Sequence, residues 1–285
     1  MNKETGKLYK AFIYLCLIIL AITIIIPVSW VFMASLKANS EFQGNPWSMP
    51  VSLMWSNYVS AWRDAGMGKY FMNSAITTAL GLIILLVVSV PCAYVLSRIE
   101  FKGSKFLNRY LRSGLFVNIS YIVIPIFLML LAWNRRFGKP IFTDNLVVLA
   151  IIYASTAIPF TVYLLSNYFR SISKTYEEAA YIDGAGYFKT MVDIMVPMAK
   201  PSIITVILFN FLAFWNEYIM ALTLLKDTKK TLPVGLVNLM QSQRAAANYG
   251  PMYAGLVIVM LPTLILYMIV QRRLTDAMMV GGDKG

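Results

Sequence analysis

Long runs of apolar residues, separated by short polar segments, dominate the pattern along this chain. Each run approaches or exceeds the length of about 20 predominantly apolar residues that an α-helix needs to cross a bilayer. Glu217 is the one charged residue inside any of them. The pattern therefore predicts six transmembrane helices, at Ala11–Leu36, Tyr70–Ser97, Ser113–Asn134, Asn145–Phe169, Pro201–Leu225 and Ala245–Gln271.

The composition agrees with this pattern. Hydrophobic residues make up 59% of the 285 residues and charged residues only 13%, whereas about 25% of the residues of soluble proteins are charged. A chain of this length favours one folded domain. We therefore expect an all-α, multi-pass membrane protein with a single domain over residues 1–285.

The distribution of Lys and Arg predicts the orientation, because cytoplasmic loops carry an excess of both. With the N-terminus inside, 15 of the 25 basic residues lie on the cytoplasmic side. The first two inner segments carry eight of them and the first outer loop carries three. We therefore expect both termini in the cytoplasm. Basic loops next to a membrane also account for the net charge of +12, so no nucleic-acid partner is expected.

The chain lacks the residues that several kinds of catalytic and binding site require. The chain has no His, and Cys16 and Cys92 lie within apolar runs, which suits a packing role better than a metal site or disulfide. Glu217 is an isolated carboxylate, without a second acid or base to form a catalytic pair. No G-x-x-x-x-G-K-[ST] phosphate loop is present. We expect no enzymatic activity and no cofactor in this chain.

A polar segment at residues 174–201 separates the fourth and fifth predicted spans. Thr175 and Glu178 have the spacing of a capping box, which predicts the start of a helix. Gly184 can adopt the left-handed conformation that ends one, and Tyr187–Val192 is long enough for a second short helix. The segment is thus predicted to be a cytoplasmic helix-turn-helix. An amphipathic helix lying on the bilayer is the alternative.

Specific residues in this segment resemble a known signature. Glu178-Ala179-Ala180, Gly184, Ile194 and Val196-Pro197 match the "EAA" pattern of importer-type ABC permeases, with Val196 where Leu is usual. The extension AAYIDGA resembles carbohydrate-uptake permeases of the maltose-transporter (MalG-like) type. Further stretches that resemble this family, in order along the chain, are NYVSAW, FKGSKFL, FWNEYIMAL, TLPVGL and the closing GGDKG.

The resemblance implies that the chain is the permease subunit of a binding-protein-dependent ABC importer in the bacterial cytoplasmic membrane. Its partners would be a second, MalF-like permease, two ATPase subunits that bind ATP and Mg²⁺, an extracytoplasmic solute-binding protein, membrane lipid and a sugar. The 174–201 segment would couple the chain to the ATPase. The coupling residues implied are Glu178, Ala179, Ala180, Asp183, Gly184, Ala185, Ile194 and Pro197. The closing residues Gly281, Gly282, Asp283, Lys284 and Gly285 would also reach the ATPase.

Three residues within the fifth span are candidates for the substrate path: Trp215, Asn216 and Glu217. Polar residues deep in a membrane helix usually face a bundle interior or a watery cavity. A Trp ring can stack on a sugar, and amide or carboxylate groups can bond its hydroxyls. The alternative is a helix–helix hydrogen bond beside an interfacial Trp. For the solute, the expectation is a sugar or oligosaccharide, and the alternative is an anionic solute such as glycerol phosphate or an acidic oligosaccharide.

Overall fold

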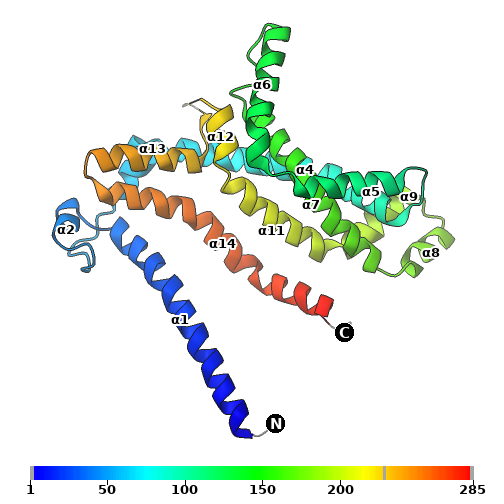
Figure 1. Ribbon diagram of the computed structural model, residues 1–285, viewed down its shortest axis with the longest axis horizontal. Coiled ribbons are helices and arrows are strands. Elements are labelled where there is room, and N and C mark those ends of the chain that lie inside the picture. The colour runs from blue at the N-terminus through cyan, green and yellow to red at the C-terminus, as the bar shows by residue number, and fades with distance from the viewer. Residues whose placement is uncertain (1–2, 227–228, 283–285) are drawn as a thin grey trace. The chain divides into compact units, whose positions relative to one another are not determined.

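All secondary structure that the computed structural model describes, over residues 3–226 and 229–282, is helical (Figure 1). Side chains are described for residues 9–226 and 229–271. The long helices are α1 (Lys3–Ser35), α4 (Met67–Arg98), α6 (Ile119–Phe137), α7 (Leu146–Ser171), α11 (Lys200–Trp215), α13 (Leu232–Ala245) and α14 (Tyr249–Gly282). The shorter helices are α2 (Asn39–Gly44), α3 (Ser56–Val59), α5 (Ser104–Ser113), α8 (Thr175–Ile182), α9 (Tyr187–Thr190), α10 (Val196–Met198) and α12 (Ile219–Leu224). Two π-helical turns, η1 (Ser60–Asp64) and η3 (Met191–Met195), and one 3₁₀ turn, η2 (Gly114–Phe116), complete the set.

Five of the described helices are long and apolar enough to cross a membrane: Tyr9–Ser35, Met67–Arg98, Ile119–Phe137, Leu146–Ser171 and Tyr249–Gln271. A bent pair, Tyr187–Met198 and Lys200–Trp215, makes a sixth if it counts as one span. The prediction of an all-helical membrane protein is confirmed in this form, with five to six candidate spans.

The third and fifth predicted spans differ most from the helices in the structure. The third was expected from Ser113, but its helix α6 begins at Ile119 because Asn118 caps it, accepting a 2.9 Å hydrogen bond from the Ser120 amide. The fifth was expected to be one helix over Pro201–Leu225. Instead α11 ends at Trp215, and α12 begins at Ile219 after a break. The break falls at the polar residues Asn216 and Glu217.

The described chain forms two compact units. The first contains the residues up to Gly68 together with Gly235–Leu261. Its most unusual feature is Lys37, whose side chain is fully buried. The Lys37 ammonium donates hydrogen bonds to the carbonyl oxygens of Asn45 at 2.8 Å and Pro46 at 3.2 Å, and to Ser48 Oγ at 3.0 Å. These bonds satisfy the buried charge and fix the loop that follows α1.

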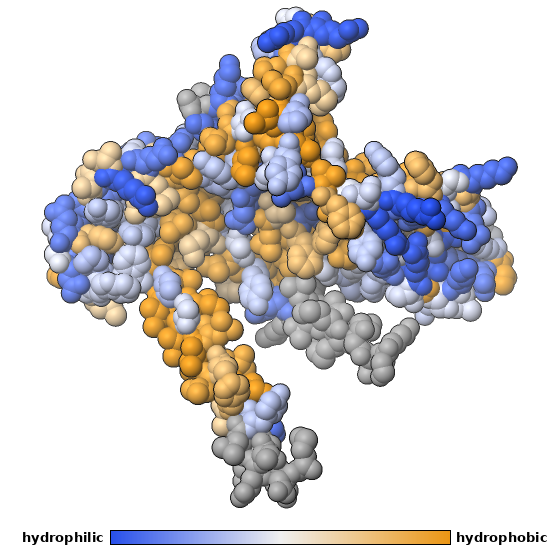
Figure 2. Space-filling view, in the orientation of Figure 1, coloured by the Kyte–Doolittle hydropathy of each residue, from blue (hydrophilic) through white to orange (hydrophobic). Residues whose placement is uncertain are grey.

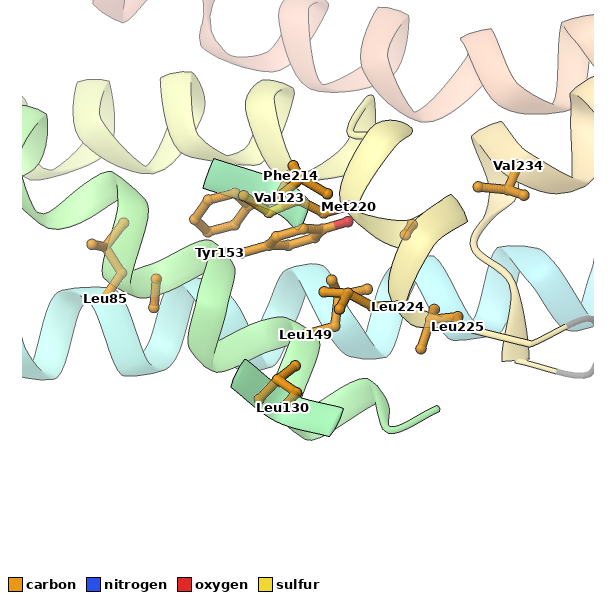
Figure 3. Packing of buried hydrophobic residues seen from close by; sticks show 12 residues of the cluster. Leu85, Val123, Leu130, Leu149, Tyr153, Phe214, Met220, Leu224, Leu225 and Val234 are labelled. Carbon is orange, nitrogen blue, oxygen red and sulfur yellow. The ribbon is translucent and has the colours of Figure 1, made fainter. Parts of the chain in front are cut away.

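The second unit contains Lys69–Val234 and the chain from Pro262 onward. One part of its core joins α4, α6, α7, α11 and α12 through the residues that Figure 3 shows, among them Leu85, Leu149, Tyr153 and Phe214. A second cluster joins α4, α7 and α11 to the π turn η3. Because Met191 and Met195 of η3 are buried in it, the polar segment between the spans is packed onto the membrane helices.

Candidate functional site

The polar segment at residues 174–201, here termed the inter-span segment, consists of α8, a turn at Gly184, and the helical run α9–η3–α10. The predicted helix-turn-helix is therefore present, but the second helix is longer than the expected Tyr187–Val192. It continues to Met198, where the chain bends by 73° into α11. The π turn η3 lies in the middle of this run, and π turns occur often at functional sites.

The start of α8 differs from the predicted capping box. The N-cap residue is Lys174, whose side chain makes no capping hydrogen bond. Thr175 already lies inside the helix, and its hydroxyl contacts that of Ser173. The Ser173 hydroxyl accepts a 3.3 Å hydrogen bond from the Thr175 amide. The capping-box prediction is wrong because the helix begins one residue earlier than the Thr-x-x-Glu spacing indicated.

Gly184 ends α8 as predicted, with a left-handed backbone (φ +81°). The Ala185 amide donates to the Ala180 carbonyl at 2.9 Å, and the Gly184 amide donates to the Tyr181 carbonyl at 3.1 Å. This pair of bonds defines a Schellman motif. A side chain at residue 184 would meet no atom within 4 Å, so glycine is required here by the backbone conformation and not by lack of space.

Glu177 anchors α8 to the end of the second span. Its Oε1 accepts a 2.9 Å hydrogen bond from the Tyr94 hydroxyl, and its Oε2 lies 3.5 Å from Arg98 Nε. Arg98 also donates a 2.5 Å hydrogen bond to the Ile172 carbonyl, just before α8. Both charged side chains are at least nine-tenths buried. Removing one partner would leave the other as an unpaired buried charge.

The remaining faces of the inter-span segment divide into a packed side and an open side. Ala180 is buried, and Ala185 and Ile194 are half-buried. The predicted coupling residues Glu178, Ala179, Asp183, Gly184 and Pro197 are exposed. The structure thus brings most of the predicted coupling residues to the surface, on a segment fastened from behind by Glu177 and the η3 methionines.

An open groove of about 370 Å³ borders this surface. Its walls include Lys174, Glu178, Tyr181 and Tyr187, with Arg98 and Glu177 behind them. Burial raises the pKa of the Tyr181 phenol; the hydrogen bond with Tyr94 opposes this shift and the Glu177 carboxylate adds to it. Tyr181 is therefore a neutral hydroxyl near pH 7. The groove offers charged and aromatic groups to a partner surface.

The sequence reasoning missed Tyr94, Arg98 and Glu177. Glu177 and Glu178 are neighbours in the same first turn of α8, so both fit the favourable helix dipole equally well. The Tyr94 partner lies 83 residues away in sequence. Arg98, the last residue of α4, could have indicated this ion pair, because a cation at the end of a span often pairs with a nearby acid.

Of the three candidate path residues, Trp215 and Glu217 make specific internal contacts. Trp215 is buried, with its ring 5.4 Å from Phe71 and stacked at 5.5 Å on Phe211. Glu217 accepts a 2.7 Å hydrogen bond from the Tyr153 hydroxyl and bonds of 2.6 and 3.0 Å from the amides of Met220 and Ala221. The carboxylate thus caps α12 and ties it to α7.

Asn216 differs from these neighbours because its side chain is exposed, with Nδ2 donating to the Leu212 carbonyl at 2.8 Å.

Two of the predicted C-terminal contact residues, Gly281 and Gly282, are the last residues of α14. The remaining candidates for an ATPase contact, Asp283, Lys284 and Gly285, lie outside the described residues.

Comparison with known proteins identifies the family. Residues 67–279 match the family described as "Binding-protein-dependent transport system inner membrane component". The chain is 34% identical to the diacetylchitobiose uptake system permease protein NgcG of Streptomyces coelicolor, over 98% of this chain and 90% of that protein. It is 29% identical to the trehalose/maltose transport system permease protein MalG of Thermococcus litoralis, over 94% of each chain.

A solved structure supports the same assignment. A chain from the crystal structure of a bacterial ABC transporter that imports the acidic polysaccharide alginate superposes with a TM-score of 0.79 at 26% identity. The match covers 95% of this chain and 98% of that one. From these matches, the chain belongs to the family of inner membrane components of binding-protein-dependent transport systems, the non-enzymatic permease subunits of ABC importers.

Proposed function

We propose that this chain forms half of the translocation path of a sugar or oligosaccharide importer, with the inter-span segment as its joint to the ATPase. The observation that carries the proposal is the inter-span segment itself. Glu178 and Ala179 of its EAA motif are exposed on one side, while Glu177, Met191 and Met195 fasten it to the membrane helices on the other. A segment held in this way transmits a push from a partner directly to α4, α7 and α11.

The partners in this proposal are those that the resemblance to ABC importers implies. The permease lies with both termini and the inter-span segment in the cytoplasm. Two ATPase subunits bind ATP and Mg²⁺ and dock at the segment, a second permease completes the path, and an extracytoplasmic binding protein delivers solute. Residues 1–285 form one permease domain in this arrangement, with residues 174–201 as the coupling loop. The relatives NgcG and MalG, both named for uptake of oligosaccharides, support a carbohydrate as the solute.

An anionic carbohydrate is a second candidate, favoured by the similarity to the alginate importer. Basic residues on the predicted outer side, Lys226, Lys229, Lys230 and Arg244, would attract an acid. Lys229 is already engaged, however: its ammonium lies 3.7 Å from the Asp144 carboxylate and donates a 2.6 Å hydrogen bond to the Asp144 carbonyl. We therefore rank a neutral oligosaccharide first.

The test is transport by the complete importer in proteoliposomes, with the binding protein and ATP supplied from the appropriate sides. Labelled neutral and uronic-acid oligosaccharides are offered in parallel. Uptake that requires this chain, the binding protein and ATP hydrolysis supports the proposal, and the preferred oligosaccharide decides between the two solutes. Transport that persists without this chain, or ATP hydrolysis that never responds to any carbohydrate-loaded binding protein, would contradict it.

A further inference from the structure

A second, larger cavity lies beside the inter-span segment and is lined by an excess of cations. Its volume is about 670 Å³, and it is open to the surface. The basic side chains that line it, here termed the basic cavity, are Arg98, Lys102, Lys105, Arg170 and Lys174. Glu100 is the acidic residue in the lining. Neither the anchoring of α8 nor the coupling surface uses the three other cations, Lys102, Lys105 and Arg170.

Arg98 is committed to Glu177, but among the described side chains the other cations of the basic cavity have no such partner. Within the part of the chain that the structure describes, no carboxylate forms an ion pair with Lys102, Lys105, Arg170 or Lys174. All four side chains are exposed. Four uncompensated cations converge on one hollow against a single carboxylate, so the cavity attracts an anion.

The position of the basic cavity in the fold indicates which anion. Arg98 is the last residue of α4, and Arg170 lies in the last turn of α7. Both helices are candidate membrane spans, which places their ends at the level of the lipid headgroups. Basic pockets between transmembrane helices at this level bind anionic headgroups, and long Lys and Arg side chains reach toward them.

The helix α5 supplies the second feature that a lipid requires. Its first turn lines the basic cavity, while Phe106 and Tyr110, one turn apart, are 74% and 65% exposed. Their rings stack on each other with centroids 6.4 Å apart. Figure 2 shows hydrophilic side chains gathered around α5 in this part of the second unit. A short helix with exposed rings and basic residues is typical of the membrane interface.

We propose that the basic cavity is a binding site for the headgroup of an anionic phospholipid, with the acyl chains leaving beside the exposed rings of α5. Phosphatidylglycerol, whose headgroup carries one phosphate charge, is such a lipid. Its phosphate would lie among Lys102, Lys105 and Arg170. Bound there, it would also contact Lys174, one residue before α8, and so help to hold the base of the inter-span segment.

The test uses the complete importer in detergent and a phosphatidylglycerol that carries a fluorescent acyl chain. Lys102→Gln/Lys105→Gln removes two cations of the cavity. Lys10→Gln/Lys200→Gln is the matched control, because it removes two lysines of the predicted cytoplasmic side that neither line the cavity nor belong to α5. With about 1 kcal/mol per basic residue near a membrane surface, the first variant should bind about thirtyfold more weakly. The control should bind like the wild-type complex.

The remaining arms separate the possible sources of the anion. Unlabelled phosphatidylglycerol should displace the probe, whereas phosphatidylcholine and soluble glycerol phosphate at equal concentration should not. Arg170→Gln provides a second cavity variant if the double variant assembles poorly. Equal weakening in the control, displacement by glycerol phosphate, or cavity variants that keep the lipid but lose the ATPase subunits on gel filtration would each overturn the proposal. The last outcome would assign the cavity to an acidic protein surface.

Discussion

The carboxylate of Glu177 accepts a 2.9 Å hydrogen bond from the hydroxyl of Tyr94, across 83 residues of sequence. The bond joins the first turn of α8 to the end of α4, and Arg98 closes the arrangement from the same helix. Glu178, the next residue, is exposed and makes no such contact within the described residues. Adjacent carboxylates therefore divide two tasks, one holding the inter-span segment and the other facing outward.

This division predicts opposite failures for two neighbouring substitutions. Glu177→Ala leaves Arg98 and Tyr94 unpaired in a buried site, which should cost about 3 kcal/mol and lower the unfolding temperature. Glu178→Ala removes an exposed acid that can meet a cation of the ATPase. It should weaken docking about tenfold or more and abolish uptake at normal membrane levels. Thermal unfolding and ATPase co-purification measure the two effects. Lower stability in Glu178→Ala, together with lost docking but normal stability in Glu177→Ala, would refute this division of roles.

Gly184 and Gly186 form a matched pair for testing backbone conformation. A Cβ atom at either residue would meet no atom within 4 Å, yet Gly184 has φ +81° whereas Gly186 has φ −77°. Gly184→Val should strain the Schellman turn by about 1–2 kcal/mol, displace α9 and abolish uptake while membrane levels stay near normal. Gly186→Val should keep substantial uptake. A Gly184→Val permease that transports at the wild-type rate with its ATPase firmly bound would disprove the role of the turn.

The break after α11 allows a test of the substrate path. Trp215→Ala, Asn216→Ala and Glu217→Gln should change transport if these residues face or shape the path. A solute contact would raise the concentration of loaded binding protein needed for half-maximal ATPase stimulation. Loss of the α12 cap would instead lower thermal stability by about 1 kcal/mol, as should Tyr153→Phe, which removes one bond to the same carboxylate. Unchanged transport and stimulation in all three path variants would exclude the assignment.

The closing residues of the chain are predicted to reach the ATPase interface. Deletion of Gly281–Gly285 should lower the ATPase activity that is coupled to solute without reducing insertion of the permease in the membrane. Uncoupled ATPase activity and the amount of membrane-inserted protein serve as controls. Wild-type coupled activity in the truncated complex would reject a contact at this end.

The hydrophobic pattern was sufficient to predict five of the six spans as single apolar helices, because a bilayer imposes a length on each apolar run. The turn was predicted from Gly184 itself, because glycine readily adopts the left-handed backbone conformation that the turn requires. Local pattern could not reveal which of Glu177 and Glu178 is buried, since that depends on Tyr94 and Arg98 from a distant helix. The early end of α11 was indicated by Asn216 and Glu217. They were interpreted as path residues, and the sequence did not reveal that Glu217 also caps the next helix.

The π turn η3 constrains the inter-span segment in a further way. A π-helical turn, with its i→i+5 bonds, holds about one residue more than an α-helical turn. Loss of any residue within Met191–Met195 would let the turn revert to α-helix and rotate α9 by about 100° relative to α11. Met191 and Met195 could then no longer both enter the core. Substitutions at the exposed residues Val192 and Asp193 should therefore be tolerated, whereas deletions or insertions within this stretch should not.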